Sequence, residues 1–446
     1  MEIFGIRTEG LGDSTYLLVH EGVGVLVDPQ RDVERFLAPL EKTGADLRFV
    51  LETHLHNDYV SGGRDAAKRT GAELVLPAAA APAFRHTPAF HMEDLDGGPL
   101  TIRPIHTPGH TPEHTSYLVL IEGRPVALFS GGSLLVGAAG RPDLLGPERA
   151  DTLARLQYRS VHRLAALPDD VGLYPTHGEG SFCTASGAGR TTSTIGQEKA
   201  TNPVLAYPDE DSFVEAQLGA LQPYPRYYRY MGPANLYGPE PLPDAAVPSL
   251  SVERLSEVDA TVVDMRPRAA YAASHLRGSL GVELRHDFGT WVGWLVDDIR
   301  TPIVLVAEPN QDVEEAVVQL NRIGIDEVVG VVTDLTRSPD LVSFRTVTVA
   351  EVADALARGE QIVDVRAPVE RETLHLPGTI HAYVPDLADG LPSDIDPSRP
   401  AWLVCATGYR ATIAASLLER HGVEPVVLTD GGVEDVARLA EASLPG

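Results

Sequence analysis

Residues 53–63 of this 446-residue chain read THLHNDYVSGG, and this stretch decides the fold of the front part of the protein. It follows residues 47–51, LRFVL, a run that predicts a buried β-strand. His54, His56 and Asp58 alternate with other residues, so the strand end presents two imidazoles and a carboxylate around one point. Such ligands at a strand end predict a catalytic metal site with open positions.

Two further histidines stand in turns of the same region. His110 lies in residues 107–111, TPGHT, and His177 lies in residues 176–178, THG, after another strand-like run. A lone histidine is usually structural, whereas several in turns after strands indicate a shared ligand cluster. We therefore expect both imidazoles to join the first three side chains.

Strand-like runs and helical patterns alternate through the front region. Residues 33–43 and 149–166 have the apolar spacing of helices. The tract at about 221–249 is rich in Pro, Tyr and Gly without clear periodicity, and it predicts a connection or rim rather than a core element. Its aromatic run, residues 224–231, is expected to pack within the tract. The alternative is a dimer surface, and hence a homo-oligomer.

An internal repeat occupies the C-terminal half. Residues 262–266, VVDMR, are followed by HLRGS at 275–279, and residues 362–366, IVDVR, are followed by HLPGT at 375–379. Each copy then continues with an apolar strand-like run that leads into a helical pattern. A repeat of about a hundred residues predicts two duplicated α/β domains rather than a solenoid.

Cys405 opens the segment CATGYR between a strand-like run and a helical pattern. Backbone amides of such a loop can surround the sulfur, while the helix N-terminus and Arg410 add positive potential. We expect the Cys405 thiol to ionise near neutral pH and accept sulfane sulfur as a persulfide, with Arg410 assisting. The loop residues expected to hold the terminal sulfur are Ala406, Thr407, Gly408 and Tyr409.

Three other positions leave alternatives open. Ala307 stands where the first repeat would need its cysteine, which predicts a packing or docking domain. Cys183 follows the His177 turn and is either a sulfur relay near the metal or a small buried side chain. Arg141, in the segment GRPD, either binds an anionic thiol or anchors its own loop to Asp143, and we favour the anchor.

The chain resembles the metallo-β-lactamase superfamily, whose signature is T-H-x-H-x-D-H, and within it the persulfide dioxygenases fused to rhodanese domains. The resemblance rests on the motifs at 53–63, 107–114 (TPGHTPEH), 140–144 (GRPDL) and 176–178, together with the C-terminal repeats. The C-x-x-G-x-R segment at Cys405 resembles the active loop of the rhodanese family.

This resemblance implies an α/β protein with three domains. An αββα metallo-β-lactamase sandwich is expected over residues 1–237. A rhodanese-like α/β domain without a cysteine would follow at 250–340, and one with the active Cys405 at 345–446.

The resemblance also implies a function. Such enzymes oxidise the outer sulfur of a small thiol persulfide, for example that of glutathione or coenzyme A, with O₂ and one iron(II) per chain. Carried over to this sequence, His54 and His110 are the imidazole ligands. His56, Asp58 and His177 form the surrounding shell or serve as alternative ligands, and zinc is the alternative metal.

Two residues depart from the family pattern. Tyr59 replaces the histidine that would bind a second metal, and Gly132 replaces the aspartate ligand of the family's F-T-G-D-T segment. Loss of that carboxylate weakens an iron(II) site, so the dioxygenase activity is expected to be impaired. We expect Gly132→Asp to raise iron affinity, with backbone strain as its main obstacle. Alternative functions are a metal-free sulfane-sulfur carrier and a zinc thioester hydrolase of glyoxalase II type.

Charge and composition argue against some classes of partner and indicate a cellular compartment. The formal net charge of −27 argues against nucleic acid as a partner. No apolar run is long enough to span a bilayer, and the N-terminus lacks a secretory pattern, so we expect a cytoplasmic protein. Cys183 and Cys405 are the two cysteines, and their separation argues against a structural disulfide.

Overall fold

The computed structural model describes residues 1–184, 189–242 and 246–442. The chain forms two compact units. The first comprises Met1–Leu242 with Val318–Gly324, and the second comprises Pro243–Val317 with Ile325–Gly446. The prediction of three domains with boundaries at 237, 250 and 345 stays a prediction.

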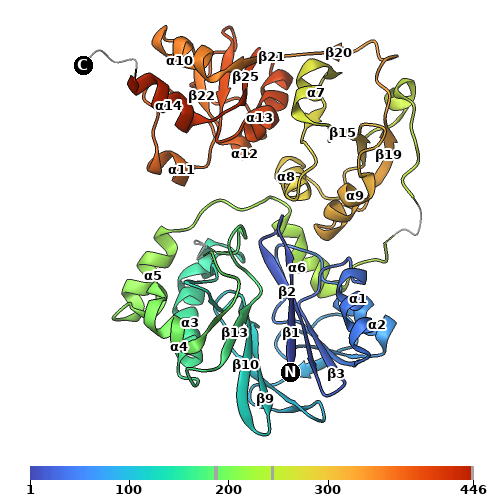
Figure 1. Cartoon of the computed structure of the whole chain (residues 1–446), viewed down its shortest axis with the longest axis vertical. Coiled ribbons are helices and arrows are strands. Elements are labelled where there is room, and N and C mark those ends of the chain that lie inside the picture. The colour runs from blue at the N-terminus through green and yellow to red at the C-terminus, as the bar shows by residue number, and fades with distance from the viewer. Residues whose placement is uncertain (185–188, 243–245, 443–446) are drawn as a thin grey trace. The chain divides into compact units, whose positions relative to one another are not determined.

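The first unit is built on two six-stranded sheets (Figure 1). The first has the order β1 (Glu2–Thr8), β2 (Asp13–His20), β3 (Val23–Val27), β4 (Asp46–Leu51), β5 (Glu73–Pro77) and β6 (Thr87–Ala89). The second has the order β14 (Ser193–Thr194), β13 (Gly172–Pro175), β10 (Arg124–Gly131), β9 (Thr115–Ile121), β8 (Thr101–His106) and β7 (Leu95–Asp96). A short hairpin joins β11 (Leu134–Leu135) and β12 (Ala138–Ala139).

Apolar side chains of both sheets form the central core. Val25 and Phe49 of the first sheet share one buried cluster with Tyr117 and Phe129 of the second. Helices cover the outer faces, as Figure 1 shows: α1 (Glu34–Thr43) and α2 (Gly63–Thr70) on the first sheet, and α3 (Pro147–Ala165), α4 (Ile195–Thr201) and α5 (Glu210–Gly219) on the second. The unit is therefore the predicted αββα sandwich, and α1 and α3 confirm the two helices expected from periodicity.

Four strands end at the turns that carry the site. β4 ends just before Thr53, β8 just before Thr107, and β13 just before Thr176, while β10 ends at Gly131. The histidine turns therefore follow the ends of strands from both sheets, as predicted from the sequence.

The second unit contains two mainly parallel sheets. The first has the order β17 (Leu280–Gly281), β15 (Thr261–Asp264), β18 (Ile303–Val306) and β19 (Val328–Val332). The second has the order β21 (Arg345–Thr348), β25 (Pro425–Asp430), β24 (Ala401–Val404), β22 (Ile362–Asp364) and β23 (Ile380–His381). A separate pair joins β16 (His275–Leu276) and β20 (Leu341–Val342).

Helices accompany both sheets of this unit. They are α7 (Arg268–Ala273), α8 (Phe288–Leu295), α9 (Val313–Arg322), α10 (Val349–Ala357), α11 (Pro368–Thr373), α12 (Val384–Leu387), α13 (Tyr409–Arg420) and α14 (Val433–Ala442). The two sheets confirm that each repeat is an α/β layer.

The aromatic tract corrects one expectation. Helix α6 (Tyr228–Tyr237) lies within it, and Tyr227, Tyr228 and Met231 are buried. The tract therefore contributes a core helix, which periodicity failed to reveal because Gly232 and Pro233 interrupt it. Burial of these side chains favours packing over the dimer surface.

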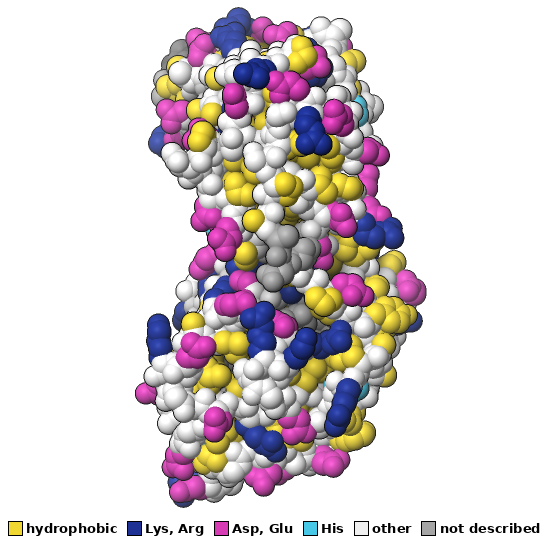
Figure 2. Space-filling model, turned by 90° about the vertical axis from the view of Figure 1, so that its right-hand side faces the viewer, with side chains coloured by type: hydrophobic (Ala, Val, Ile, Leu, Met, Phe, Trp, Pro, Cys, Tyr) yellow, Lys and Arg dark blue, Asp and Glu magenta, His cyan; other side chains and the backbone are white. Residues whose placement is uncertain are grey.

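The surface carries mixed charges. Figure 2 shows Asp and Glu interspersed with Lys and Arg over the face that it presents. Across the described residues, helices are too short or too polar to cross a membrane.

Candidate metal centre and cysteine loop

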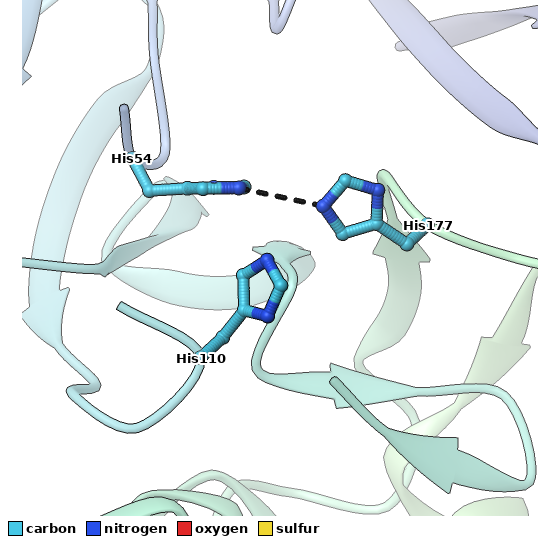
Figure 3. Close-up of side chains that lie close together, drawn as sticks. All are labelled: His54, His110 and His177. Carbon is cyan, nitrogen blue, oxygen red and sulfur yellow. Dashed lines mark hydrogen bonds between the residues drawn. The ribbon is translucent and has the colours of Figure 1, made fainter. Parts of the chain in front are cut away.

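Three histidines converge at the strand ends of the first unit (Figure 3). His54, His110 and His177 each offer a ring nitrogen, and these atoms all lie within 4.8 Å of one another. The Nε2 atoms of His54 and His177 are 3.4 Å apart. All three side chains are buried. The structure thus brings His54 and His110 together with His177, which the sequence placed in the surrounding shell or as an alternative ligand, in one set of groups that could hold an ion.

The partners of the other ring nitrogens fix the tautomers. His110 Nδ1 lies 2.8 Å from the carbonyl oxygen of Arg141. A carbonyl only accepts, so His110 Nδ1 carries the proton and Nε2 presents a lone pair. Among the described residues, His110 Nε2 has no hydrogen-bond partner.

The same argument holds for the other two rings. Thr53 Oγ1 donates its hydrogen to Asp28 at 2.7 Å, so it accepts from His54 Nδ1 at 2.8 Å. His177 Nδ1 donates to Asp13 Oδ1 at 2.8 Å. All three Nε2 lone pairs therefore face one point, where they repel each other unless a cation lies between them.

Burial keeps these imidazoles neutral. Burial first, and then neighbouring imidazoles, lowers the pKa of His54 and of His110 well below the ordinary value. Burial also lowers the pKa of His177, although Asp58 opposes the shift. Neutral imidazoles with oriented lone pairs are the form that binds a divalent transition metal, and the residues fit such an ion.

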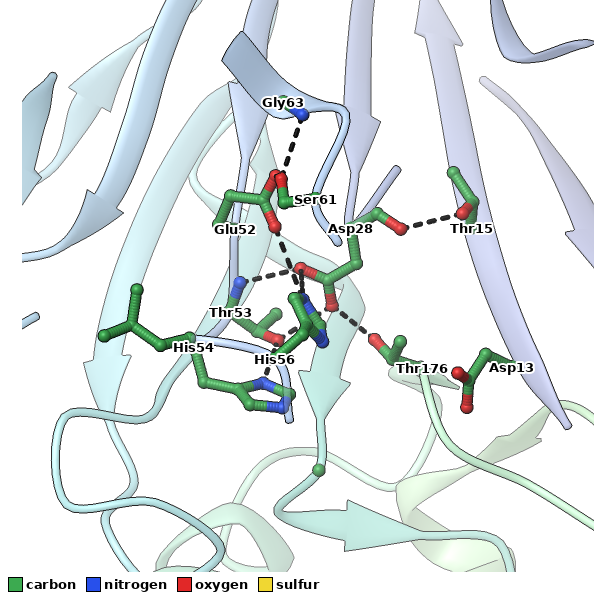
Figure 4. Close-up of polar contacts among 12 residues, drawn as sticks. Asp13, Thr15, Asp28, Glu52, Thr53, His54, His56, Ser61, Gly63 and Thr176 are labelled. Atoms are coloured by element: carbon green, nitrogen blue, oxygen red, sulfur yellow. Dashed lines mark hydrogen bonds and ion pairs between the residues drawn. The ribbon is translucent and has the colours of Figure 1, made fainter. Parts of the chain in front are cut away.

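His56 lies beside the set of His54, His110 and His177, in the surrounding shell, and it also belongs to a second group that could hold an ion, with Asp58 and His177. Its Nε2 lies 3.2 Å from Asp28 Oδ1, 3.3 Å from Glu52 Oε2 and 3.0 Å from the Tyr59 hydroxyl (Figure 4). Although burial lowers it, the two carboxylates raise the pKa of His56 well above its usual range. Its Nε2 is therefore surrounded by carboxylates and the Tyr59 hydroxyl, whereas its Nδ1 has no hydrogen-bond partner among the described residues.

Tyr59 completes this buried ion cluster. Its ring stacks on His56, with centroids 4.3 Å apart, and its hydroxyl donates to the carbonyl oxygen of Asp28 at 3.2 Å. Tyr59 thus stabilises the His56 ring, whose Nε2 contacts Asp28 and Glu52 while its Nδ1 lies 4.0 Å from Asp58 Oδ1.

Asp58 lies behind His177 rather than among the Nε2 atoms. Its Oδ2 is 3.3 Å from His177 Nδ1, on the same side of the ring as Asp13. Burial raises the pKa of Asp13 and of Asp58 to about 7, so the two carboxyl groups hold a proton more readily than exposed ones. This pair orients His177, as carboxylates behind metal-binding histidines do.

The His110 ring occupies the space that a side chain at position 132 would need. A Cβ atom at position 132 would lie 2.3 Å from His110 Cδ2. The positive φ in this segment belongs to Gly131, at 55°, and not to Gly132. The obstacle to an aspartate at 132 is therefore the His110 ring, not the backbone strain that the sequence led us to expect.

Asn235 and His114 contact the site but were not predicted from the sequence as site residues. Asn235 of α6 donates from Nδ2 to the carbonyl oxygens of His56 and Tyr59, both at 2.8 Å, and accepts from Ser61 N. His114 accepts from Gly132 N at 2.9 Å, so its Nε2 lone pair is used. No local pattern marks Asn235, whereas the TPGHTPEH motif contained His114.

Arg141 and Cys183 lie beside the His110 turn. Arg141 pairs with Asp143 at 2.7 Å, donates to the carbonyl of Phe182 at 2.9 Å, and stacks on Tyr224. These contacts support the anchoring role. The Cys183 thiol is fully buried 3.9 Å from the Tyr228 hydroxyl, and burial raises its pKa well above the ordinary value. Its environment is that of an unreactive thiol.

Cys405 lies at the end of β24 in the second unit, where the sequence placed it. Gly408 N, at the N-terminus of α13, donates to the Cys405 Sγ at 3.1 Å. Ala406 and Thr407 are exposed. Arg410 forms a two-bond ion pair with Glu370, with Nη2 2.7 Å from Oε1. The guanidinium is therefore held by a carboxylate, a partner that the sequence did not indicate.

Known proteins share both parts of the chain. Residues 9–177 match the metallo-beta-lactamase superfamily, and residues 348–439 match the rhodanese-like domain.

Individual proteins extend this similarity. A probable metallo-hydrolase of Burkholderia pseudomallei is 30% identical over 203 residues, which are 36% of this chain and 67% of that protein. A hydroxyacylglutathione hydrolase of Methylobacterium is 30% identical over 227 residues, 43% of this chain and 85% of that protein. The crystal structure of a metallo-beta-lactamase from Staphylococcus aureus superposes with a TM-score of 0.67 at 28% identity, covering 75% of this chain and 99% of that one.

Replacement of single histidines will separate the metal ligands from their neighbours. We expect His177→Ala to weaken metal binding about 100-fold, because one of three donors is lost. His56→Gln should keep the affinity within a few-fold but lower the free energy of unfolding by about 3 kcal/mol, since Asp28 and Glu52 lose their buried cation. Metal titration and chemical denaturation measure the two effects. Equal loss of metal in both variants would contradict this assignment.

Position 132 offers a second test of the same geometry. Gly132→Ala should lower metal affinity about tenfold, because the new methyl group displaces the His110 ring, and Gly132→Asp should fail to raise it. Gly219→Ala is the matched control, since a Cβ there meets no atom within 4 Å. Stoichiometric metal retained at full affinity in Gly132→Ala would show that His110 is not a ligand.

Proposed function

The chain belongs to the metallo-β-lactamase superfamily and carries a rhodanese-like domain at its C-terminal end, and from this premise we propose that it metabolises persulfides of a small thiol. In this proposal Cys405 transfers sulfane sulfur, and the front domain acts on the thiol derivative with one metal ion.

One observation carries the proposal. The Gly408 N–H···Sγ contact of 3.1 Å places the Cys405 sulfur at the N-terminal end of α13, where the helix dipole favours negative charge. A sulfur held in this way can act as a thiolate nucleophile. Arg410, the second residue of α13, lies in the same region, with its guanidinium paired to Glu370.

The transfer step balances with these groups alone. The Cys405 thiolate attacks the outer sulfur of a persulfide R–S–SH and forms a new S–S bond. The S–S bond of the donor breaks, the thiolate R–S⁻ leaves with the electron pair, and the outer sulfur keeps its hydrogen in Cys405–S–SH. An acceptor thiolate then removes the outer sulfur from Cys405 by the same chemistry.

The front domain supplies a metal pocket for the thiol derivative. His54, His110 and His177 would hold the ion, and Asp13 with Asp58 would orient His177. A bound zinc ion would supply Lewis-acid chemistry, whereas iron would supply chemistry with O₂. The hydroxyacylglutathione hydrolase relatives favour a glutathione derivative over other thiols.

A thioester hydrolase is the second candidate. It is favoured by the same relative, named as a hydroxyacylglutathione hydrolase, at 30% identity over 85% of its length. Three neutral imidazoles form a donor set that suits zinc. The paired rhodanese-like domain favours sulfane sulfur instead, because hydrolysis has no use for a sulfur-accepting cysteine.

Mutation of each cysteine will test the transfer activity. Cys405→Ser should abolish transfer from glutathione persulfide to a thiol acceptor, whereas Cys183→Ser should retain most of it, because the Cys183 thiol is buried and protonated. Mass spectrometry should show one added sulfur atom on Cys405 after treatment with the donor. Unchanged turnover in Cys405→Ser would exclude this function.

The chemistry of the front domain is tested on metal-loaded protein. We expect one tightly bound ion per chain, because Tyr59 and Gly132 offer no imidazole or carboxylate ligand for a second ion. Persulfide-dependent oxygen uptake by the iron-loaded protein would support the dioxygenase. Hydrolysis of a hydroxyacyl-glutathione thioester by the zinc-loaded protein, without oxygen uptake, would favour the second candidate. Two ions per chain would contradict the single site.

A further inference from the structure

The part of the second unit that lacks a cysteine packs against the surroundings of Cys405. We call residues 250–317 and 325–340 the cysteine-less lobe. Its helix α8 carries Trp291 and Trp294, which are about one turn apart. Trp291 contacts Tyr409 edge to face, with centroids 6.2 Å apart, and Trp294 contacts Tyr383 in the same manner at 6.0 Å.

Tyr409 of the CATGYR loop is enclosed by this lobe. The guanidinium carbon of Arg285 lies 4.5 Å from the centroid of the Tyr409 ring. The Tyr409 hydroxyl donates to the carbonyl oxygen of Glu283 at 3.4 Å. Only 4% of the Tyr409 side chain is exposed, so its position is set by the lobe rather than by solvent.

The lobe also holds the far end of α13. Arg420 donates from Nε and Nη2 to the carbonyl oxygen of Gly278 at 3.0 and 2.6 Å. Glu419 lies 3.2 Å from His275 Nε2. Both ends of the helix that begins beside Cys405 are therefore fixed by contacts outside its own domain.

These contacts bear directly on the sulfur. Tyr409 follows Gly408, whose N–H donates to the Cys405 Sγ and whose φ is 82°. Glycine has no side chain to fix its own conformation, and a Cβ at this position would lie 2.7 Å from Thr429 Cα. The carbonyl oxygen of Gly408 accepts from Thr412 N and Oγ1 at 3.1 and 3.0 Å, and the next residue, Tyr409, adds a side-chain anchor in the lobe that helps to hold the amide on the sulfur.

We propose that the cysteine-less lobe is a positioning element for Cys405, acting through Arg285 and Trp291 on Tyr409. This proposal rests on the proposed sulfurtransferase function. Arg285, Trp291 and Tyr409 are positioning residues, because they keep the Gly408 amide aimed at the sulfur without contacting the donor. Their loss should slow sulfur transfer while leaving donor affinity nearly unchanged.

The test compares kcat and KM for glutathione persulfide, together with formation of the Cys405 persulfide by mass spectrometry. Arg285→Ala and Tyr409→Ala should lower kcat about tenfold and change KM by less than about twofold. The conservative variants Arg285→Lys and Tyr409→Phe should recover kcat to within about threefold of the unmodified protein. Arg337→Ala is the matched control, because this arginine of the same lobe forms an exposed ion pair with Glu253.

The outcomes separate the two proposals. If the unmodified protein forms the persulfide and Arg285→Ala matches it in kcat, the positioning role is wrong and the transfer function stands. An equal loss of kcat in Arg337→Ala would also overturn the positioning role. If the unmodified protein forms no Cys405 persulfide, the proposed function fails, and this inference fails with it. Arg285 is partly exposed, so its variants keep the test open if Tyr409→Ala does not fold.

Discussion

One buried carboxylate organises the metal centre. Asp28 follows β3 with a positive φ of 53° and accepts hydrogen bonds from the backbone N–H and hydroxyl of Thr53, both at 2.7 Å. It also accepts from the Thr176 hydroxyl and pairs with His56. Burial alone would raise the pKa of Asp28, but His56 and these hydrogen bonds lower it below the ordinary value. Because Thr53 and Thr176 begin turns from different sheets, Asp28 ties both histidine turns together.

The buried histidines of the site differ in whether they contact the Asp28 carboxylate. His56 lies against Asp28 and Glu52: burial lowers the pKa of His56, but these two groups raise it well above its ordinary value, while burial raises the pKa of Glu52 itself. His54, His110 and His177 are paired through Nδ1 with acceptors and remain neutral. Tyr59 stacks on the His56 ring and donates to the carbonyl oxygen of Asp28, so it packs on the histidine that lies against the carboxylates.

The sequence predicted which turns meet but not how each ring points. The spacing of His54 and His56 indicated a shared site, and the strand ends do bring His54 to His110 and His177. The direction of His56 depends on Asp28 and on Asn235, which lies 179 residues away. Local spacing cannot carry such distant contacts. The absent carboxylate at Gly132 was visible in the sequence, whereas the His110 ring that occupies its space was not.

The two repeats of the second unit show which interactions a fold keeps when its chemistry is absent. In both, an arginine donates to the aspartate two residues before it and to a backbone carbonyl: Arg266 to Asp264 and Ser274, and Arg366 to Asp364 and Leu374. This arginine clamp joins the end of the strand to the end of the helix that follows it, so it stabilises the fold of each copy. Ala307 follows β18 as Cys405 follows β24, without a sulfur. A duplicated domain that retains its clamp but not its nucleophile can contribute only through its surface, and the surface it places on Tyr409 lies one residue from the amide that holds the Cys405 sulfur.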